Sequence, residues 1–122
     1  RRCTGGGLAQ GVSGAMGLQH VVLFSFAPEL CEKDEAEMLS QIRSWPELIG
    51  GIDELRVGRS SSTERTRDYS HLMYMVVADE EALRAYQRHP LHEAFAAFVV
   101  ERGGTVLAFD YNLDAETVVL PR

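Results

Sequence analysis

The chain has few cysteines, no long apolar run and an excess of acidic over basic residues, and each of these features excludes a class of protein. Its two cysteines, Cys3 and Cys31, have the spacing of neither a zinc site nor a redox pair. They fit a reducing compartment better than a disulfide-stapled secreted domain. No apolar stretch approaches the length of a membrane span. The net charge of −6 argues against a general nucleic-acid binder, which needs clustered Lys and Arg. We therefore expect a cytoplasmic protein with neither a nucleic acid nor a membrane as partner.

The 122 residues suffice for one domain with one hydrophobic core. Residues 1–18 are rich in glycine and small side chains and lack the apolar run of a signal peptide. We expect them to be a disordered leader without a function of its own. Residues 19–122 are expected to form a single domain.

The apolar pattern predicts four strands and two helical regions. The strands are expected over residues 20–26, 52–58, 71–78 and 105–113, where apolar side chains are continuous or alternate. In the first helical region, Asp34 and Glu37 have the spacing of a capping box. In the second, Asp79 is a candidate cap before two glutamates. Pro90 interrupts this second region, so a new helix is expected to start near His89 or Pro90.

The resulting order, β-α-β-β-α-β, predicts an α+β ferredoxin-like fold with a four-stranded antiparallel sheet and helices on one face. The strands offer apolar side chains to both faces, but the helices can cover only one of them. Because a large exposed apolar patch is not a stable monomer surface, we expect two sheets to pack face to face in a homodimer. The last residues, 114–122, are expected to form a short extra strand or an arm that reaches the partner subunit.

Several short motifs, taken in order, resemble one known family. They are His-x-x-x-x-x-Phe over residues 20–26, Val57-Gly58, Tyr69-x-His71, His89-Pro90-x-His92 and Phe109-Asp110-Tyr111. Over about residues 18–113 the chain looks like the stress-responsive A/B barrel domain (Dabb) of the dimeric α/β barrel superfamily. The resemblance implies two ferredoxin-like domains that pair into a dimeric α/β barrel. Most members of this family are functionally uncharacterised, and they include plant stress-induced proteins and at least one plant polyketide cyclase.

The resemblance also implies roles for five side chains. In cyclase-type members a tyrosine and a histidine carry the chemistry, and these positions match Tyr86 and His92. The positions that match His20, His71 and Asp110 line or support the same region, and we treat them as substrate-binding candidates. Since a fold hosts many functions, these roles remain expectations from analogy.

The local chemistry of His92 is consistent with a proton-transfer role. In the first turn of a helix that starts at Pro90, its imidazole meets the positive end of the helix, which favours the neutral base. Such a base could remove a proton while Tyr86 donates a hydrogen bond to a developing oxyanion, with no cofactor. In the alternative interpretation, both residues only shape a helix break and their polar atoms are satisfied by the backbone. No metal is expected at His89-x-x-His92-Glu93, because the ligands are too few and their spacing is wrong.

Two polar residues are expected to meet across the sheet. In the strand order 4-1-3-2, the first and last strands are adjacent and antiparallel, so His20 and Asp110 fall at the same end. His71 opens the third strand and falls toward the other end. We therefore predict a His20–Asp110 pair before a His20–His71 pair. The alternative is a buried polar contact that only fixes the register.

Three functions remain open from the sequence. The first is a homodimer that binds a small apolar or polyketide-like molecule in a cavity between sheet and helices. The second is a cofactor-free enzyme, similar to a polyketide cyclase or an isomerase, that uses His92 and Tyr86. The third is a structural stress protein without a ligand. An apolar cavity around His92 would favour the first two, and a filled interior would favour the third.

Overall fold

The structure, a computed structural model, describes residues 17–114. The predicted leader, apart from its last two residues, and the predicted C-terminal arm, apart from residue 114, lie outside the described residues. Leu18, which we had assigned to the leader, is instead the first residue of the first strand and is buried.

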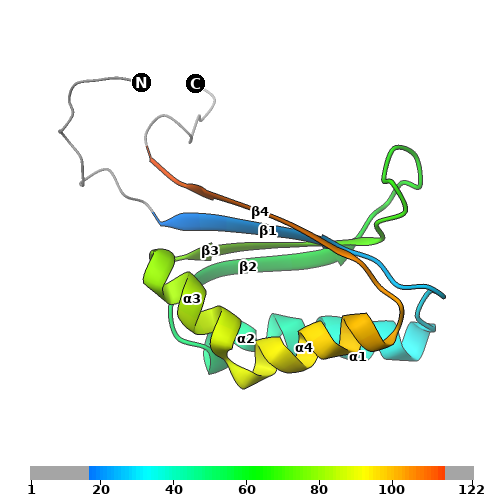
Figure 1. The fold of residues 1–122 in the computed structure, drawn as a ribbon, viewed down its shortest axis with the longest axis horizontal. Coiled ribbons are helices and arrows are strands. Elements are labelled where there is room, and N and C mark those ends of the chain that lie inside the picture. The colour runs from blue at the N-terminus through cyan, green and yellow to red at the C-terminus, as the bar shows by residue number, and fades with distance from the viewer. Residues whose placement is uncertain (1–16, 115–122) are drawn as a thin grey trace.

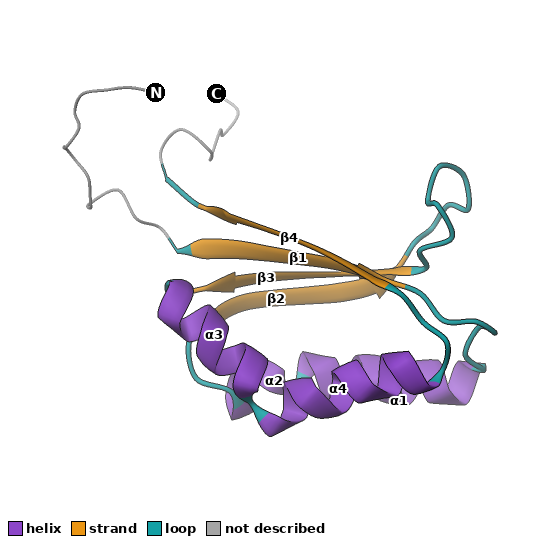
Figure 2. Ribbon diagram, viewed as in Figure 1, coloured by secondary structure: helices purple, strands orange, loops and turns teal. Residues whose placement is uncertain are grey.

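The described residues form one antiparallel sheet with all helices on one side of it, as Figure 1 and Figure 2 show. The strand order is β2-β3-β1-β4, which confirms the predicted ferredoxin-like topology. The elements in chain order are β1 Leu18–Phe24, α1 Glu32–Arg43, α2 Trp45–Leu48, β2 Ile52–Arg59, β3 His71–Val77, α3 Glu80–Arg88, α4 Pro90–Glu101 and β4 Val106–Asn112.

The first strand and the first helix both begin earlier than predicted. β1 ends at Phe24, where its pairing with both neighbouring strands stops, and not at Phe26. α1 begins at Glu32 after Cys31, so Asp34 lies inside the first turn and the predicted capping box is wrong. Three carboxylates in that turn lie at the positive end of the helix, where their negative charge is stabilising.

The break between α3 and α4 follows the prediction. His89 is extended (φ −68°, ψ 139°), as the residue before a proline prefers to be. Its Nδ1 accepts a hydrogen bond from the backbone N–H of Leu91 at 3.1 Å, and Pro90 occupies the first helical position. Because a single extended residue separates the two helices, the end of α3 and the first turn of α4 lie next to each other. The predicted cap Asp79 is also confirmed, since it accepts from Ala82 N–H at 2.8 Å.

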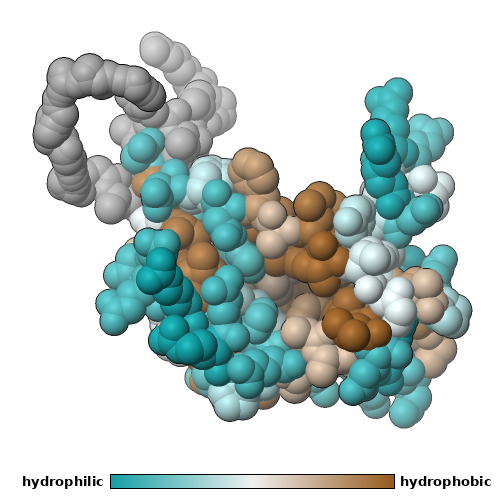
Figure 3. Space-filling model, viewed as in Figure 1, coloured by the Kyte–Doolittle hydropathy of each residue, from teal (hydrophilic) through white to brown (hydrophobic). Residues whose placement is uncertain are grey.

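The hydrophobic core fills the layer between the sheet and the helices. It is formed by one face of β1 and β3 and by the apolar sides of the helices; its fully buried large side chains are Phe24, Ile42, Met73, Met75, Val77, Tyr86 and Val99. The other face of the sheet carries no helix. Leu72, Leu107 and Phe109 lie on that open face with 42%, 52% and 66% of their surface exposed. Figure 3 shows apolar residues gathered across the middle of the molecule, at the level of β4 and the end of α4.

Candidate functional site

Four of the five predicted site residues come together at one place between the sheet and the α3–α4 break. His20 lies near the middle of β1 and faces the helices. Tyr86 lies in the last turn of α3, and His92 lies in the first turn of α4. Asp110 is the register partner of His20 on β4, and its carboxylate accepts a hydrogen bond from His20 Nδ1. The predicted His20–Asp110 pair is therefore confirmed.

Tyr86 is the centre of this cluster. Its side chain is completely buried, and its ring packs at an angle against the ring of His92, with centroids 4.7 Å apart. The centroid of the His20 ring lies 5.8 Å from that of Tyr86. The Tyr86 hydroxyl is buried without a hydrogen-bond partner among residues 17–114. Burial raises the pKa of this phenol, so it stays protonated and is a hydrogen-bond donor throughout the physiological pH range.

One ring nitrogen of His92 has no partner among the described residues. Its Nδ1–H donates to the backbone carbonyl of Gln87 at 3.0 Å, which leaves Nε2 as an acceptor with no partner among the described residues. Burial lowers the pKa of His92, with a further contribution from nearby His20, and these effects outweigh the bond to Gln87. His92 is therefore a neutral imidazole at pH 7. A backbone carbonyl satisfies one ring nitrogen of His92, as expected if the residue only shapes the helix break, but it does not satisfy the other.

The cluster is open on the side of β4. All seven residues of β4 are exposed, including those that face the helix layer, so no helix covers this strand. The carboxylate side of the His20–Asp110 pair is 37% exposed, whereas the His20 side chain is almost completely buried. A molecule that approaches beneath β4 would meet Asp110 first and the two imidazoles behind it.

Two hollows of the structure lie away from His92, around which the sequence had raised the possibility of a cavity. A groove of about 440 Å³ lies between α1 and α4, and a pocket of about 680 Å³ lies on the open sheet face at the β2–β3 loop. Neither is lined by His20, Tyr86 or His92. The cluster itself is packed, with Trp45 also in contact with the Tyr86 ring.

His71 does not join the cluster. It pairs with Phe24, four residues along β1 from His20, which corresponds to about 13 Å of strand. Its Nε2 shares a hydrogen bond of 2.6 Å with the Glu35 carboxylate, and the Ser70 hydroxyl lies 2.7 Å from its Nδ1. The family resemblance implied that His71 lies in the same region as His20, and this prediction is wrong. The strand register had placed His71 at the other end of the sheet, and this prediction is confirmed.

The His71 group is a second buried polar cluster that joins α1 to β3. Burial lowers the pKa of His71, and its bond to Glu35 opposes this effect only in part. For Glu35, burial pulls the pKa upward, but hydrogen bonds from Arg59 and His71 outweigh it and hold this pKa below its usual value. Sequence reasoning missed Glu35, because no motif surrounds it. Its only signal was its position in the first turn of a helix that must cover the strand carrying His71.

Residues 17–114 contain neither a metal-ligating cluster nor a membrane-spanning helix. No group of three or more His, Cys, Asp or Glu side chains in this range is placed to hold a metal ion. No helix in it is long and apolar enough to cross a membrane.

The helix layer, the open sheet face and the His20–Asp110 pair define a ferredoxin-like α+β domain with a polar cluster at its helix break. The chain belongs to the family described as the stress-responsive A/B barrel domain, whose profile matches residues 18–113. An uncharacterized protein of Streptomyces coelicolor is 30% identical over 97 residues, which cover 78% of this chain and 98% of that protein.

Solved structures show the same fold. A dimeric ferredoxin-like protein of unknown function from Thermobifida fusca is 20% identical, with a TM-score of 0.69 over 85% of this chain and 96% of that one. A hydroxynitrile lyase from Passiflora edulis is 12% identical, with a TM-score of 0.70 over the same shares of the two chains. At these identities the likeness establishes the fold alone.

Proposed function

We propose that this protein is a homodimer that binds a small, largely apolar molecule at the cluster of Tyr86, His92 and His20. The dimer is supported by the open face of the sheet, where Leu72 on β3 and Leu107 and Phe109 on β4 are exposed on either side of β1. Contiguous apolar surface of this kind marks an interface. The similar protein from Thermobifida fusca is described as dimeric.

The observation that carries the ligand proposal is the buried Tyr86 hydroxyl. A buried polar atom without a partner costs about 1–3 kcal/mol, and nearly all such atoms in native proteins are paired. The phenol lies beside two imidazoles and behind the open β4 side. A ligand with a carbonyl oxygen would satisfy the hydroxyl, and its apolar part would lie against the aromatic rings of the cluster. Because the cluster is packed, binding would require side chains near His92, which is only half-buried, to move.

A catalytic function on this site is the second candidate, and the free nitrogen of His92 favours it. In a proton transfer, His92 Nε2 would take a proton from the carbon next to the carbonyl group. The electron pair of the broken C–H bond would move to the carbonyl oxygen, where the Tyr86 hydroxyl would stabilise the charge. The His20–Asp110 pair would hold the cluster in place. An enolisation, an isomerisation or a polyketide-type ring closure all begin with this step.

A fragment screen by NMR tests the proposal. Aromatic ketones and β-keto compounds are titrated into the dimer, together with hydrocarbons of the same shape that lack the carbonyl group. The expected result is saturable movement of the His92 and Tyr86 resonances by ketones only, and loss of this response in Tyr86→Phe. Tyr74→Phe is the matched control, since Tyr74 already donates to Glu54 at 3.4 Å on the opposite face.

His92→Ala separates binding from catalysis. For each ketone that binds, exchange of its α-protons with deuterated solvent is followed by NMR. Exchange that is faster with the wild type than with His92→Ala, while both proteins stay folded and bind, supports the enzyme. Binding without accelerated exchange supports a binding protein. If no carbonyl compound shifts the His92 or Tyr86 resonance, neither the binding protein nor the enzyme is supported. The third function, a structural protein without a ligand, then replaces them.

A further inference from the structure

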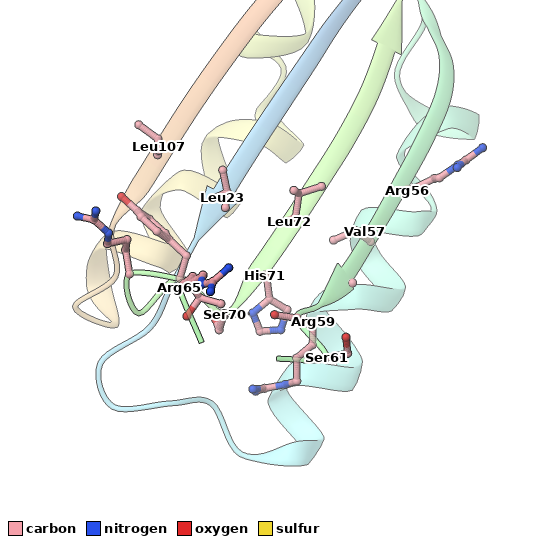
Figure 4. A pocket seen from close by; sticks show the side chains of 15 residues that line it. Leu23, Arg56, Val57, Arg59, Ser61, Arg65, Ser70, His71, Leu72 and Leu107 are labelled. Carbon is pink, nitrogen blue, oxygen red and sulfur yellow. Dashed lines mark hydrogen bonds between the residues drawn. The ribbon is translucent and has the colours of Figure 1, made fainter. Parts of the chain in front are cut away.

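The pocket of about 680 Å³ at the β2–β3 loop lies within the surface that the proposed homodimer buries. Its floor is a leucine row, Leu23, Leu72 and Leu107, whose members are register partners on β1, β3 and β4. Figure 4 shows these three side chains next to one another, with Arg65 and Ser70 beside them. In the homodimer the second copy covers this floor. Because the core of a stable interface is packed as densely as a protein interior, a segment of the second copy must fill the pocket.

The β2–β3 loop, residues 60–70, forms one wall of the pocket. It rises from the end of the sheet on the side away from the helices, as Figure 1 shows. Packed sheets lie about 10 Å apart, so a loop on this side stands beside the second copy. The loop is therefore placed to contact the partner directly.

The wall that this loop contributes is basic. Arg65 and Arg67 line the pocket, and neither forms an ion pair with another residue in the range 17–114. Arg59 also lines it but is already paired with Glu35 at 2.7 Å. Among the residues that the structure describes, no aspartate or glutamate lines the pocket, although the whole chain carries a net charge of −6. The wall is thus complementary to a carboxylate from the second copy.

The charge of the loop also favours one orientation of the two copies. When two sheets pack face to face with aligned strands, the two-fold axis between them runs either along the strands or across them. An axis along the strands brings both basic loops to the same end of the dimer, where their arginines repel one another. An axis across the strands places each loop at the end of the other copy where β4 finishes. We therefore expect the second arrangement.

The far end of β4 is the point from which residues 115–122 continue. β4 ends at Asn112, five residues beyond Leu107, and Figure 1 shows this end opposite the β2–β3 loop. With the axis across the strands, it lies over the leucine row of the other copy. Residues 115–122 span about 26 Å when extended, which is enough to lie along that row. To reach the pocket of their own chain, they would have to reverse direction and cross the face that the second copy covers.

Residues 115–122 also have the chemistry that the pocket requires. Glu116 is their one acidic side chain, and in an extended chain Val118 and Leu120 fall on the same side as Glu116. An acid followed by two apolar side chains matches a basic wall beside an apolar floor. Residues 1–16 adjoin the same end of the sheet, since Leu18 pairs with Asn112, but they contain two arginines and no acid. Charge therefore argues against them as the occupant.

We propose that residues 115–122 of the second copy occupy this pocket, in both halves of the homodimer. The Glu116 carboxylate pairs with the guanidinium groups of Arg65 and Arg67, and Val118 and Leu120 lie against the leucine row. The inference rests on the proposed homodimer but not on a ligand at the Tyr86 cluster. The contact fixes the orientation in which the two sheets pair.

Sedimentation velocity over a dilution series tests the proposal by measuring the Kd of the dimer. Deletion of residues 115–122 removes the whole segment, E116Q removes only its carboxylate, and R65Q/R67Q removes the guanidinium partners. R84Q/R88Q on α3 and E101Q on α4 are the matched controls, since these side chains are exposed and lie outside the open sheet face. Arg65 and Arg67 are exposed as well, so we expect the variants to fold, which circular dichroism checks.

Deletion of the segment should raise the Kd about ten-fold or more, because it removes apolar contacts as well as the ion pairs. E116Q and R65Q/R67Q should each raise it about three-fold or more, since an exposed ion pair contributes little but occurs twice in the dimer. Combining these two changes should add nothing further, because both remove the same contact. In about 1 M salt the effect of the charge variants should disappear, while that of the deletion should remain. The controls should stay within about two-fold of the wild type.

The outcomes separate this inference from the homodimer itself. If the wild type is a dimer but the deletion, E116Q and R65Q/R67Q leave its Kd unchanged, the inference is overturned and the homodimer stands. If the wild type is a monomer at every concentration, the homodimer is overturned and this inference with it.

A cross-link distinguishes the segment of the second copy from that of the same chain. Cys3 and Cys31 are replaced by serine, and the pair S61C/L120C is treated with a flexible bismaleimide; Ser61 is an exposed residue of the pocket lining. The single variants S61C and L120C are the controls, and mass spectrometry identifies the linked peptides. A link between positions 61 and 120 of two different chains supports the proposal. A link within one chain, or none between these positions, overturns it.

Discussion

Replacement of Tyr86 by phenylalanine should make the ligand-free protein more stable. The phenol is completely buried, and its hydroxyl has no partner among the described residues. The substitution removes only this oxygen and keeps the ring contacts with His92, His20 and Trp45. An unsatisfied buried hydroxyl costs about 1–3 kcal/mol, and the small cavity left by one oxygen offsets part of the gain. We expect the free energy of unfolding to rise by roughly 1 kcal/mol, or the Tm by about 4 °C.

Urea unfolding followed by far-UV circular dichroism measures this change. Wild type and variant are compared at the same protomer concentration, because the stability of a dimer depends on concentration. Tyr74→Phe is the control, since that hydroxyl donates to Glu54 at 3.4 Å and its loss should leave stability unchanged or slightly reduced. A Tyr86→Phe variant that is less stable than the wild type by about 1 kcal/mol or more would show that the hydroxyl is not an unsatisfied group. Its hydroxyl would then be a satisfied structural group.

Three other outcomes follow from the structure. Burial holds the pKa values of His71 and His92 below their usual 6.5, so the unfolded chain binds protons first as the pH falls. Urea unfolding should therefore show a free energy of unfolding that is full above about pH 6.5 and declines below it. A rise in this free energy between about pH 7 and 5.5 would contradict these shifts. Phe109→Glu places a charge on the open sheet face, and light scattering after gel filtration should show a monomer, whereas an unchanged dimer would mean that another surface pairs. A methyl group at Gly104 would meet the Ser25 carbonyl oxygen and the Val99 side chain, so Gly104→Ala should lower the free energy of unfolding by about 1–3 kcal/mol. Gly58→Ala is the control, because nothing lies within 4 Å of the added carbon there. It should change the free energy of unfolding by less than about 0.5 kcal/mol.

The sequence was sufficient for the strand order and for the pairing of His20 with Asp110. Both follow from antiparallel register, which the alternation of apolar residues and the position of turns determine. It was also sufficient for the helix restart at His89, because proline geometry acts locally.

Other parts of the site could not be predicted, because they depend on contacts between distant elements. Glu35 reaches His71 only because α1 packs over the sheet, and nothing in its neighbourhood in the sequence signals that contact. The start of α1 at Glu32 also departs from local capping rules. The orphaned hydroxyl of Tyr86 is a property of the packed interior, where burial and the directions of its neighbours decide whether a partner is within reach.

We propose above all that Tyr86 and His92 form a site for a carbonyl compound. The most direct measurement records the ¹³C–¹H spectra of the histidine and tyrosine rings during titration with aromatic ketones and their hydrocarbon counterparts. We expect at least one ketone to shift the His92 and Tyr86 signals to saturation, its hydrocarbon counterpart to leave them unchanged, and Tyr86→Phe to abolish the His92 response. Ketones and hydrocarbons that leave both ring signals unshifted, or that shift the His92 signal equally in wild type and Tyr86→Phe, would rule out this site.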